Sequence, residues 1–325
     1  MSNMIRRLLS RFTMAPASEA SKASSGARSA DMIPADLQAR FSKTLLGELR
    51  EQKGHEVDNG LYETIIVSFV FNHERIEGNA TSELDTRTIF ETRDIVLEDD
   101  SISNDVRETA NHTLMFDYLI DTIDEPLDEA LIRGLHRSLM QGVMKTPGEW
   151  KVNPNGAGSV STVRPCDVSE AIDALLTSYG RHQATLDNIT RFHVRYETIH
   201  PFADGDGRTG RAIMFRECLR SGLIPFIVTD ETKDRYYSAL DAFRRGDNSL
   251  LAYALDMQRE FLRLTLPLLQ DVELAEELSR YVTGIELASP AALPDDYFVG
   301  DIIENATVAR VPLGGAAHPE ELPER

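Results

Sequence analysis

The sequence has 325 residues, of which 42% are hydrophobic and 27% charged, as expected for a globular chain with a sizeable core. Its net charge of −19 argues against broad nucleic-acid binding, because phosphate contacts require an excess of Lys and Arg. Two cysteines, Cys166 and Cys218, are too few for a disulfide framework or a zinc site, and no apolar stretch is long enough to span a membrane. We therefore expect a cytoplasmic protein with neither nucleic acid nor a membrane as its partner.

The two ends of the chain differ in composition from the middle. Residues 1–32 are rich in Ser, Ala and Arg, and their apolar run is too short and interrupted for a secretory signal, so we expect a disordered tail. The alternative is an address that sends the protein to an organelle or out of a bacterium as a secreted effector. Residues 271–325 form a C-terminal extension with several Pro and Gly residues, and we expect it to be partly disordered.

Helices are predicted along most of residues 33–270. An apolar residue or His recurs every four positions in one stripe, which predicts a helix that Gly78 ends. Pro126 opens the next helix, because its missing N–H costs nothing in a first turn. The stripe of the first helix is Leu61, Ile65, Phe69 and His73, and the ridge of the second is Leu127, Leu131, Leu135 and Leu139.

Further helices follow a loop between Pro147 and Pro165 that is expected to carry an exposed hairpin. Asp167 and Glu170 look like the capping pair of a helix. Other helices are expected up to Ile199, from Arg208, and over residues 234–268. We predict an all-α fold with an N-terminal helical region over residues 33–125 and a core over residues 126–270.

The stretch HPFADGDGRTGR, residues 200–211, carries the chemistry. Pro201 ends one helix and Arg208 lies at the start of the next, so the glycines between them leave backbone N–H groups uncovered at a helix N-terminus. Such a site holds anions. Arg208 and Arg211 project from one face of the first turn and suit a polyphosphate.

Two further groups point to transfer of a phosphoryl or nucleotidyl group. Asp204 repels phosphate unless it binds Mg²⁺, which bridges a carboxylate and a phosphate. His200 is placed to take the proton of an attacking hydroxyl. An EF-hand loop counted from Asp204 would need Gly where Thr209 stands and Glu where Phe215 stands, so calcium is excluded. Zinc is excluded because no second His or Cys lies at ligand spacing.

The stretch resembles the signature of the Fic family, usually written H-P-F-x-(D/E)-G-N-G-R-x-x-R. The likeness extends over about residues 131–255, including GEWKV at residues 148–152 and DRYYSAL at residues 234–240. It implies a helical bundle core with a small β-hairpin flap. Most characterised members transfer AMP from ATP to a hydroxyl side chain of another protein, so the resemblance implies a protein adenylyltransferase.

The resemblance also implies roles for single residues. His200 becomes the general base that deprotonates a Ser, Thr or Tyr of the target, Phe202 fixes the loop in the core, and Asp204 holds Mg²⁺. The residues expected to bind the phosphates and the adenine of ATP are Gly205, Asp206, Gly207, Arg208, Arg211, Tyr236 and Tyr237. The two tyrosines are equally well explained as core residues. The flap that pairs with an extended piece of the target comprises Gly158, Ser159, Val160, Ser161, Thr162 and Val163.

One position departs from the family pattern. Asp206 stands where the family usually has Asn, whose amide can donate to phosphate, whereas an ionised Asp cannot. Three consequences of this Asp remain open. It could weaken ATP binding, it could bind a second cation, or it could have little effect because the backbone N–H groups make most of the contacts with the phosphates.

A second motif predicts autoinhibition. Many Fic proteins carry (S/T)-x-x-x-E-(G/N) on a helix, and its Glu pairs with the second arginine of the signature. Here Glu77 and Gly78 match the end of that motif, while His73 stands where Ser or Thr is expected. Arg211 can pair with Glu77 or with the γ-phosphate, not with both at full strength. We therefore expect Glu77 to inhibit the protein.

Two alternatives to AMP transfer remain at this point. The same residues would also serve removal of AMP from a modified protein, and the domain could instead act as a weakly catalytic docking module. The expected partners are ATP and an unidentified target, with automodification and a homodimer left open. Mg²⁺ is the expected cofactor.

Overall fold

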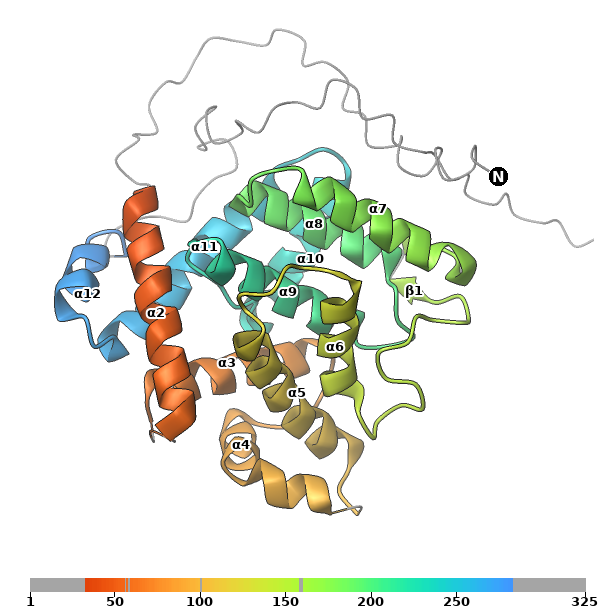
Figure 1. Ribbon diagram of the computed structural model, residues 1–325, viewed down its shortest axis with the longest axis horizontal. Helices are drawn as coiled ribbons and strands as arrows, with labels where there is room; N and C mark the ends of the chain where they lie inside the picture. Colours follow the sequence, from red (N-terminus) through yellow and green to blue (C-terminus); the bar gives the residue numbers. More distant parts are fainter. Residues whose placement is uncertain (1–32, 56, 58, 100, 158–159, 283–325) are drawn as a thin grey trace, which may run out of the picture. The chain divides into compact units, whose positions relative to one another are not determined.

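The computed structural model describes residues 33–282 apart from 56, 58, 100, 158 and 159. The expected tail over residues 1–32 and most of the expected extension over residues 271–325 lie outside this part. The helices are α2 Ala35–His55, α3 Leu61–Ile76, α4 Glu83–Glu98, α5 Asn104–Asp121, α6 Glu129–Met140, α7 Val168–Gly180, α8 Leu186–Ile199, α9 Asp206–Arg220, α10 Lys233–Arg244, α11 Ser249–Thr265 and α12 Val272–Ser279. The prediction of an all-α fold is confirmed (Figure 1). Within the described ranges no helix combines the length and apolarity that a membrane span requires.

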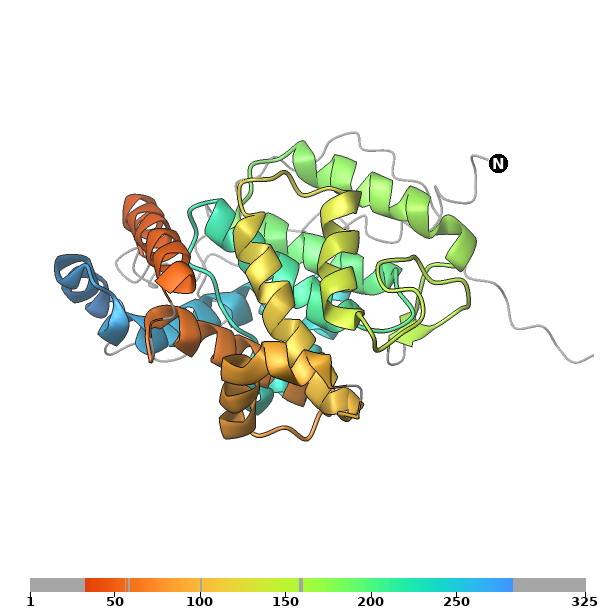
Figure 2. The ribbon, with the colours of Figure 1, turned by 60° about the horizontal axis from the view of Figure 1, so that its bottom comes forward.

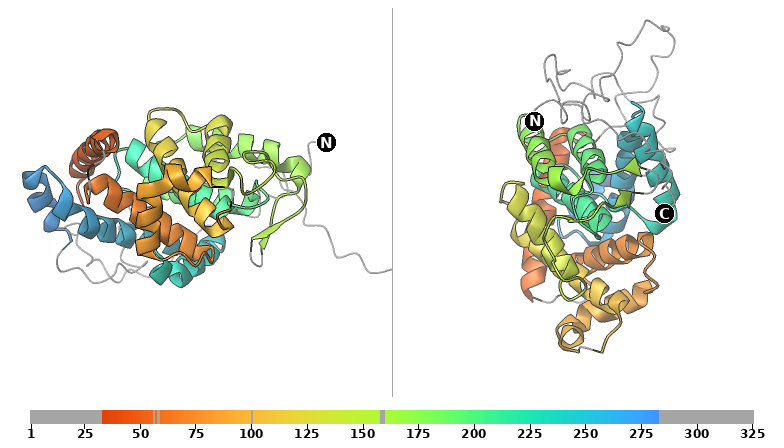
Figure 3. Two further views of the ribbon diagram at one scale, coloured as in Figure 1. Left: turned by 90° about the horizontal axis from the view of Figure 1, so that it is seen from below. Right: turned by 90° about the vertical axis from the view of Figure 1, so that its right-hand side faces the viewer.

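Short elements connect these helices. Three 3₁₀ helices, η3, η4 and η5, cover Pro165–Asp167, Asp230–Thr232 and Leu266–Leu268. The one described pair of strands is an antiparallel hairpin of β1 Gly156–Ala157 and β2 Val160–Ser161, in which Gly156 faces Ser161. Figure 3 shows this hairpin at one edge of the helices.

Helix α9 runs through the middle of the bundle. It contacts α2, α3, α5, α6 and α8, so side chains on nearly every side of it are buried. Helix α4 packs on α3 and α5 at the periphery (Figure 2). Helix α12 lies beside α2, where Arg40 forms an ion pair with Glu277 at 3.0 Å. The first turn of α9 therefore begins inside a ring of other helices.

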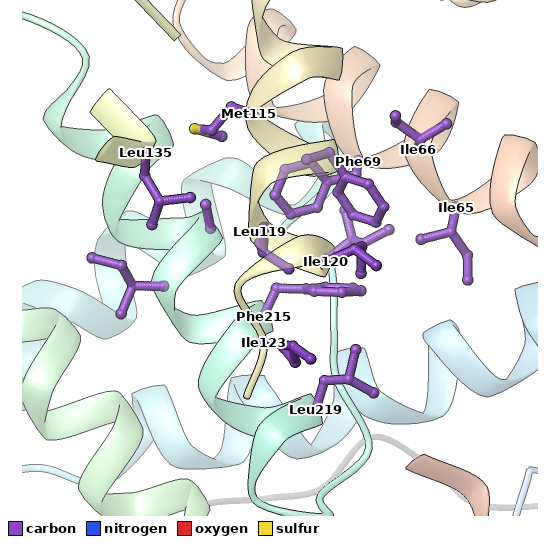
Figure 4. Close-up of a cluster of buried hydrophobic side chains, with 14 of the residues drawn as sticks. Ile65, Ile66, Phe69, Met115, Leu119, Ile120, Ile123, Leu135, Phe215 and Leu219 are labelled. Atoms are coloured by element: carbon purple, nitrogen blue, oxygen red, sulfur yellow. The ribbon is translucent and has the colours of Figure 1, made fainter. Parts of the chain in front are cut away.

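One apolar core joins segments that lie far apart in the sequence (Figure 4). Ile65 and Phe69 of α3 meet Phe116 of α5 and Phe215 of α9, with the ring centroids of Phe69 and Phe215 5.4 Å apart. Burial of such side chains stabilises a fold by about 2 kcal/mol each. The predicted stripe of α3 thus faces this core.

One predicted helix start and one predicted capping contact were wrong. Helix α6 begins at Glu129, not at Pro126, because the side chain of Asp128 accepts a hydrogen bond from the Leu131 N–H and caps the helix there. Asp167 does not cap α7 through its side chain, because its carboxylate binds Nε of Arg164 at 2.8 Å.

Helix α3 ends where the sequence predicts. Gly78 takes a left-handed φ of 92°, and the N–H of Asn79 donates to the carbonyl of Glu74. A left-handed residue after the last turn is the usual way to end a helix, and glycine adopts it without strain. Glu77 is thereby held at the very end of the helix.

Candidate active site

His200 is the residue that ends α8. Its backbone is left-handed, with φ 51° and ψ 65°, and its N–H donates to the carbonyl of Tyr196. Few residues other than glycine adopt this conformation. Pro201 follows and prevents the helix from continuing. The ring of His200 is therefore carried by a helix end and not by a free loop.

The imidazole of His200 has two close polar neighbours on its Nδ1 side. Oδ2 of Asp206 lies 2.9 Å away and Nδ2 of Asn155 lies 2.8 Å away. Burial lowers the pKa of His200, but the contact with Asp206 and the charge of Glu197 outweigh burial, so that the pKa is raised above its ordinary value.

Asp206 turns its side chain away from the face where a phosphate would sit. Only 1% of the residue is exposed, and Oδ1 accepts the N–H of Phe202 at 2.9 Å. The carboxylate therefore holds the His200 loop together from inside. Only the backbone N–H of Asp206 remains for the predicted phosphate contact.

The N-terminus of α9 forms an open anion cradle. Gly205 is the N-cap with φ 78°, and no side chain caps the helix. The first N–H groups of a helix have no partner within it, so they are available to an anion. A Cβ at Gly207 would lie 2.6 Å from Oε1 of Glu77, which means that this carboxylate approaches the cradle closely because position 207 lacks a side chain.

Asp204 lies at the mouth of the site. Its side chain is 69% exposed, and one oxygen, Oδ1, accepts the N–H of Gly205 at 2.6 Å. Within the described ranges no three residues with metal-binding side chains come together. One carboxylate shared with substrate phosphates is nevertheless a common set of ligands for Mg²⁺, so the site fits that ion.

Arg208 does not point into the open cradle. Its guanidinium is buried, with Nη1 3.1 Å from Oε1 and 3.2 Å from Oε2 of Glu74, and it also pairs with Glu108 of α5. Nδ1 of His112 lies 2.7 Å from Glu74 as well. Burial alone would raise the pKa of Glu74, but Arg208 and His112 outweigh it and hold the pKa at about 2.

Arg211 meets the predicted inhibitory residue. Its Nη2 donates to Oε1 of Glu77 at 2.7 Å and to the backbone carbonyl of His73 at 3.3 Å. Arg211 is buried, while the Glu77 side chain is one third exposed. His73 contributes its carbonyl to this contact, and its ring packs on Phe69 with centroids 4.1 Å apart.

The sequence analysis assigned no role to three residues of the site. The ring of His136 stacks on Phe202 with centroids 3.6 Å apart, accepts the N–H of Gly148 at Nδ1, and donates from Nε2 to the carbonyl of Asp204. Phe202 is fully buried, as the resemblance implies. The other two residues without an assigned role are Lys151 and Asn155, which lie in the irregular loop before the hairpin.

Lys151 links the hairpin to the His200 loop. Its buried Nζ donates to Oδ1 of Asn155, to Oγ1 of Thr162 and to the carbonyl of Ile199 at 2.6, 3.0 and 3.2 Å. Burial lowers the pKa of Lys151 to about 8. One ammonium group thus ties the base of the flap to the residue before His200.

The predicted flap is partly displaced along the chain. The strands pair over residues 156–157 and 160–161, and the predicted Gly158 and Ser159 lie outside the described residues. Val163 lies beyond the paired strands, and its side chain is buried in the core. Thr162 is tied to Lys151 and to the carbonyl of Asn155, so it anchors the hairpin.

The two tyrosines predicted to bind adenine differ in their exposure to solvent. Tyr236 is buried, and its Oη lies 2.5 Å from Nε2 of His193, which favours its explanation as a core residue; its contact with adenine stays a prediction. Tyr237 is 44% exposed and lies within the electrostatic influence of Glu77 and Arg211. It stays a candidate for the nucleotide.

The segment that carries this site is similar to known proteins. Residues 126–218 match the family model described as Fic/DOC family. The protein adenylyltransferase Fic of Aedes aegypti is 26% identical over 193 residues, which cover 56% of this chain and 38% of that protein. The matched segment thus spans about two fifths of the length of this curated relative.

Solved structures share the fold. A Fic domain containing signaling protein from Bacteroides thetaiotaomicron superposes with a TM-score of 0.56 at 20% identity, covering 77% of this chain and all of that one. Fic-1 from C. elegans gives a TM-score of 0.52 at 21% identity and covers 70% of each chain.

Proposed function

We propose that the protein is an adenylyltransferase that moves AMP from ATP to a Ser, Thr or Tyr hydroxyl of a target protein, because residues 126–218 match the Fic/DOC family model. The observation that carries the proposal is the arrangement of one loop and one helix turn. His200, the open N-terminus of α9 and the exposed carboxylate of Asp204 all belong to this short segment. The relative from Aedes aegypti, which is named a protein adenylyltransferase, supports the same reaction.

In the proposed reaction, Nε2 of His200 takes the proton of the target hydroxyl, and the hydroxyl oxygen attacks the α-phosphorus of ATP. The bond from that phosphorus to the bridging oxygen breaks, pyrophosphate leaves, and AMP remains on the target. The N–H groups of Asp206 and Gly207 hold the phosphates during the attack. An extended piece of the target pairs with the edge of the hairpin formed by β1 and β2.

Asp204 is the residue that would hold Mg²⁺ in this proposal. When bound, the ion supplies positive charge that offsets the charge on the phosphates and on the departing pyrophosphate.

We further propose that Glu77 keeps the protein in a state of low activity. Its carboxylate lies against Gly207 and pairs with Arg211, the side chain that the proposal assigns to the γ-phosphate. Two negative groups cannot share one buried guanidinium at full strength. ATP therefore binds without its γ-phosphate in the productive place while Glu77 remains there.

The test uses ATP labelled at the α-phosphate, with Mg²⁺ and a cell lysate. It compares the unaltered protein with Glu77→Gly and with Glu77→Gly, His200→Ala. Asp99→Gly serves as a matched control, because Asp99 is the acidic C-cap of α4 as Glu77 is the C-cap of α3. We expect Glu77→Gly to give about ten times or more labelled protein than the unaltered protein, Asp99→Gly or the double variant.

Each other outcome rejects one part of the proposal. Equal label with the unaltered protein and with Glu77→Gly contradicts the inhibitory role. Label that survives His200→Ala contradicts the base. If no sample labels protein, AMP transfer is rejected, and a target already carrying AMP is the next substrate to try, because the same groups suit its removal.

A further inference from the structure

The carboxylate of Asp206 contacts the base of the proposed reaction, not the nucleotide. It bridges two points of one loop, accepting the N–H of Phe202 at Oδ1 and lying 2.9 Å from Nδ1 of His200 at Oδ2. Within the described part of the chain, Oδ2 is buried and no donor other than this ring reaches it. A buried carboxylate oxygen without a donor is costly, so this oxygen requires a proton on Nδ1.

A second neighbour of Nδ1, the amide of Asn155, favours the tautomer in which Nδ1 carries no proton. The amide of Asn155 is oriented by its oxygen, which accepts from Lys151 at 2.6 Å and from Thr162 at 2.9 Å. Its Nδ2 therefore faces His200, and an N–H donated to Nδ1 would leave the ring proton on Nε2. Such a ring could not accept a proton from a hydroxyl.

The contact with Asp206 determines the tautomer of His200 more strongly than the contact with Asn155 does. Nδ2 of Asn155 has another acceptor, the carbonyl of Phe202 at 2.6 Å, whereas Oδ2 of Asp206 has none. A hydrogen bond to a carboxylate is also stronger than one between neutral groups. The arrangement that gives the buried Oδ2 of Asp206 a donor places the proton on Nδ1 and leaves Nε2 as a free acceptor, while the Asn155 amide keeps its bond to the Phe202 carbonyl.

We propose that Asp206 is the positioning residue of this site, holding His200 in the tautomer with the proton on Nδ1 and stabilising the imidazolium that forms when Nε2 takes the proton of the target. This inference deepens the proposed function and rests on it. It gives the departure from the family's Asn a chemical role, because an amide whose oxygen stays on the Phe202 N–H turns its NH₂ toward Nδ1. The amide then favours the unproductive tautomer.

Other charged groups face His200 and remain when Asp206 is changed. Glu197 on α8 favours the charged ring, and Lys151 opposes it. Replacement of Asp206 by Asn therefore removes the closest negative charge while the charges on α8 and on the preceding loop stay in place. The effect of that replacement on the ring is thus separable from the rest of the site.

The kinetic test is made in the Glu77→Gly protein, with kcat and KM for ATP measured from about pH 5 to about pH 9. We expect Asp206→Asn to lower kcat about 100-fold with little change in KM, and to move the acid limb of the rate profile about one unit toward lower pH. Asp234→Asn, in the first turn of α10, is the matched control and leaves both unchanged. A raised KM with unchanged kcat would assign Asp206 to nucleotide binding and overturn the proposal, as would an unmoved acid limb.

A second readout does not depend on activity. Nitrogen NMR spectra of the imidazoles, with His200→Ala to assign the signal, report which ring nitrogen carries the proton. We expect the Nδ1–H form in the parent and in Asn155→Ala, and the Nε2–H form in Asp206→Asn. The Nε2–H form in the parent would overturn the positioning role even if AMP transfer occurs, and failure of the parent to transfer AMP would leave this measurement valid.

Discussion

Arg208 and Glu74 form an ion pair 3.1 Å apart in the interior, between the first turn of α9 and the last turns of α3. Three further groups complete the network: Glu108 pairs with Arg208, while His112 and Nδ2 of Asn79 bind the Glu74 carboxylate. A buried charge is tolerated only when it is paired and hydrogen-bonded. The arginine that the family resemblance assigns to phosphate is therefore also a structural partner of α3.

Glu74→Gln should destabilise the protein by roughly 3 kcal/mol, because it removes the most deeply buried of the carboxylates that pair with the buried guanidinium of Arg208. Glu108→Gln is the matched control. It removes a partially exposed carboxylate from the same arginine and should cost about 1 kcal/mol or less. Urea denaturation of both variants measures the difference. Equal losses in the two variants would contradict a dominant role of Glu74.

Tyr236 and Tyr237 should respond oppositely to substitution. Tyr236→Phe removes the hydrogen bond to the buried Nε2 of His193 and should cost about 2 kcal/mol of stability without changing KM for ATP. Tyr237→Ala should leave stability within about 0.5 kcal/mol and raise KM for ATP several-fold, because this ring is exposed beside Glu77 and Arg211. The kinetics are measured with Glu77→Gly in both cases. A raised KM in Tyr236→Phe would mean that the buried ring reaches the nucleotide after all.

Acid should unfold the protein more readily than its surface charge alone implies. Burial lowers the pKa of His136 to about 4 and that of His193 to about 3, so the folded chain stays unprotonated at these rings where the unfolded chain takes up protons. Their contribution to stability is complete above about pH 6.5 and is lost as the pH falls toward 4. His136 alone accounts for roughly 3 kcal/mol over that range.

The measurement is the free energy of unfolding in denaturant between about pH 7 and about pH 4. His136→Gln should flatten its dependence on pH, whereas His182→Gln, at an exposed position, should leave the slope as it is. A slope that His136→Gln leaves unchanged would show that folding does not lower the pKa of this ring.

The helices and the signature loop were predictable because their signals are local. A stripe of apolar residues marks α3, a proline after His200 marks the end of α8, and a glycine at 78 marks the end of α3. The ion pair of Arg211 with Glu77 could also be anticipated, since a motif names both ends of it.

The surroundings of the site were not predictable, because they are built from isolated residues. His136 sits on an apolar helix where nothing distinguishes it, and Lys151 and Asn155 lie in an irregular loop whose path depends on the hairpin. Asp206 is readable as a phosphate ligand until the direction of its side chain is known. The positions of these side chains depend on contacts between segments that are distant in the sequence, and the spacing of residues along the chain does not predict such contacts.

Glu77 stands at the end of a helix whose Ile65 and Phe69 are fully buried. An inhibitory segment on a flexible tether acts at an effective concentration that the length of its linker sets. Glu77 has no such linker, so the strength of its proposed competition with a γ-phosphate would depend on the packing of the core. Under the proposed inhibition, a signal that relieves it would act on the last turn of α3, around Gly78, since withdrawing the whole helix would open the core.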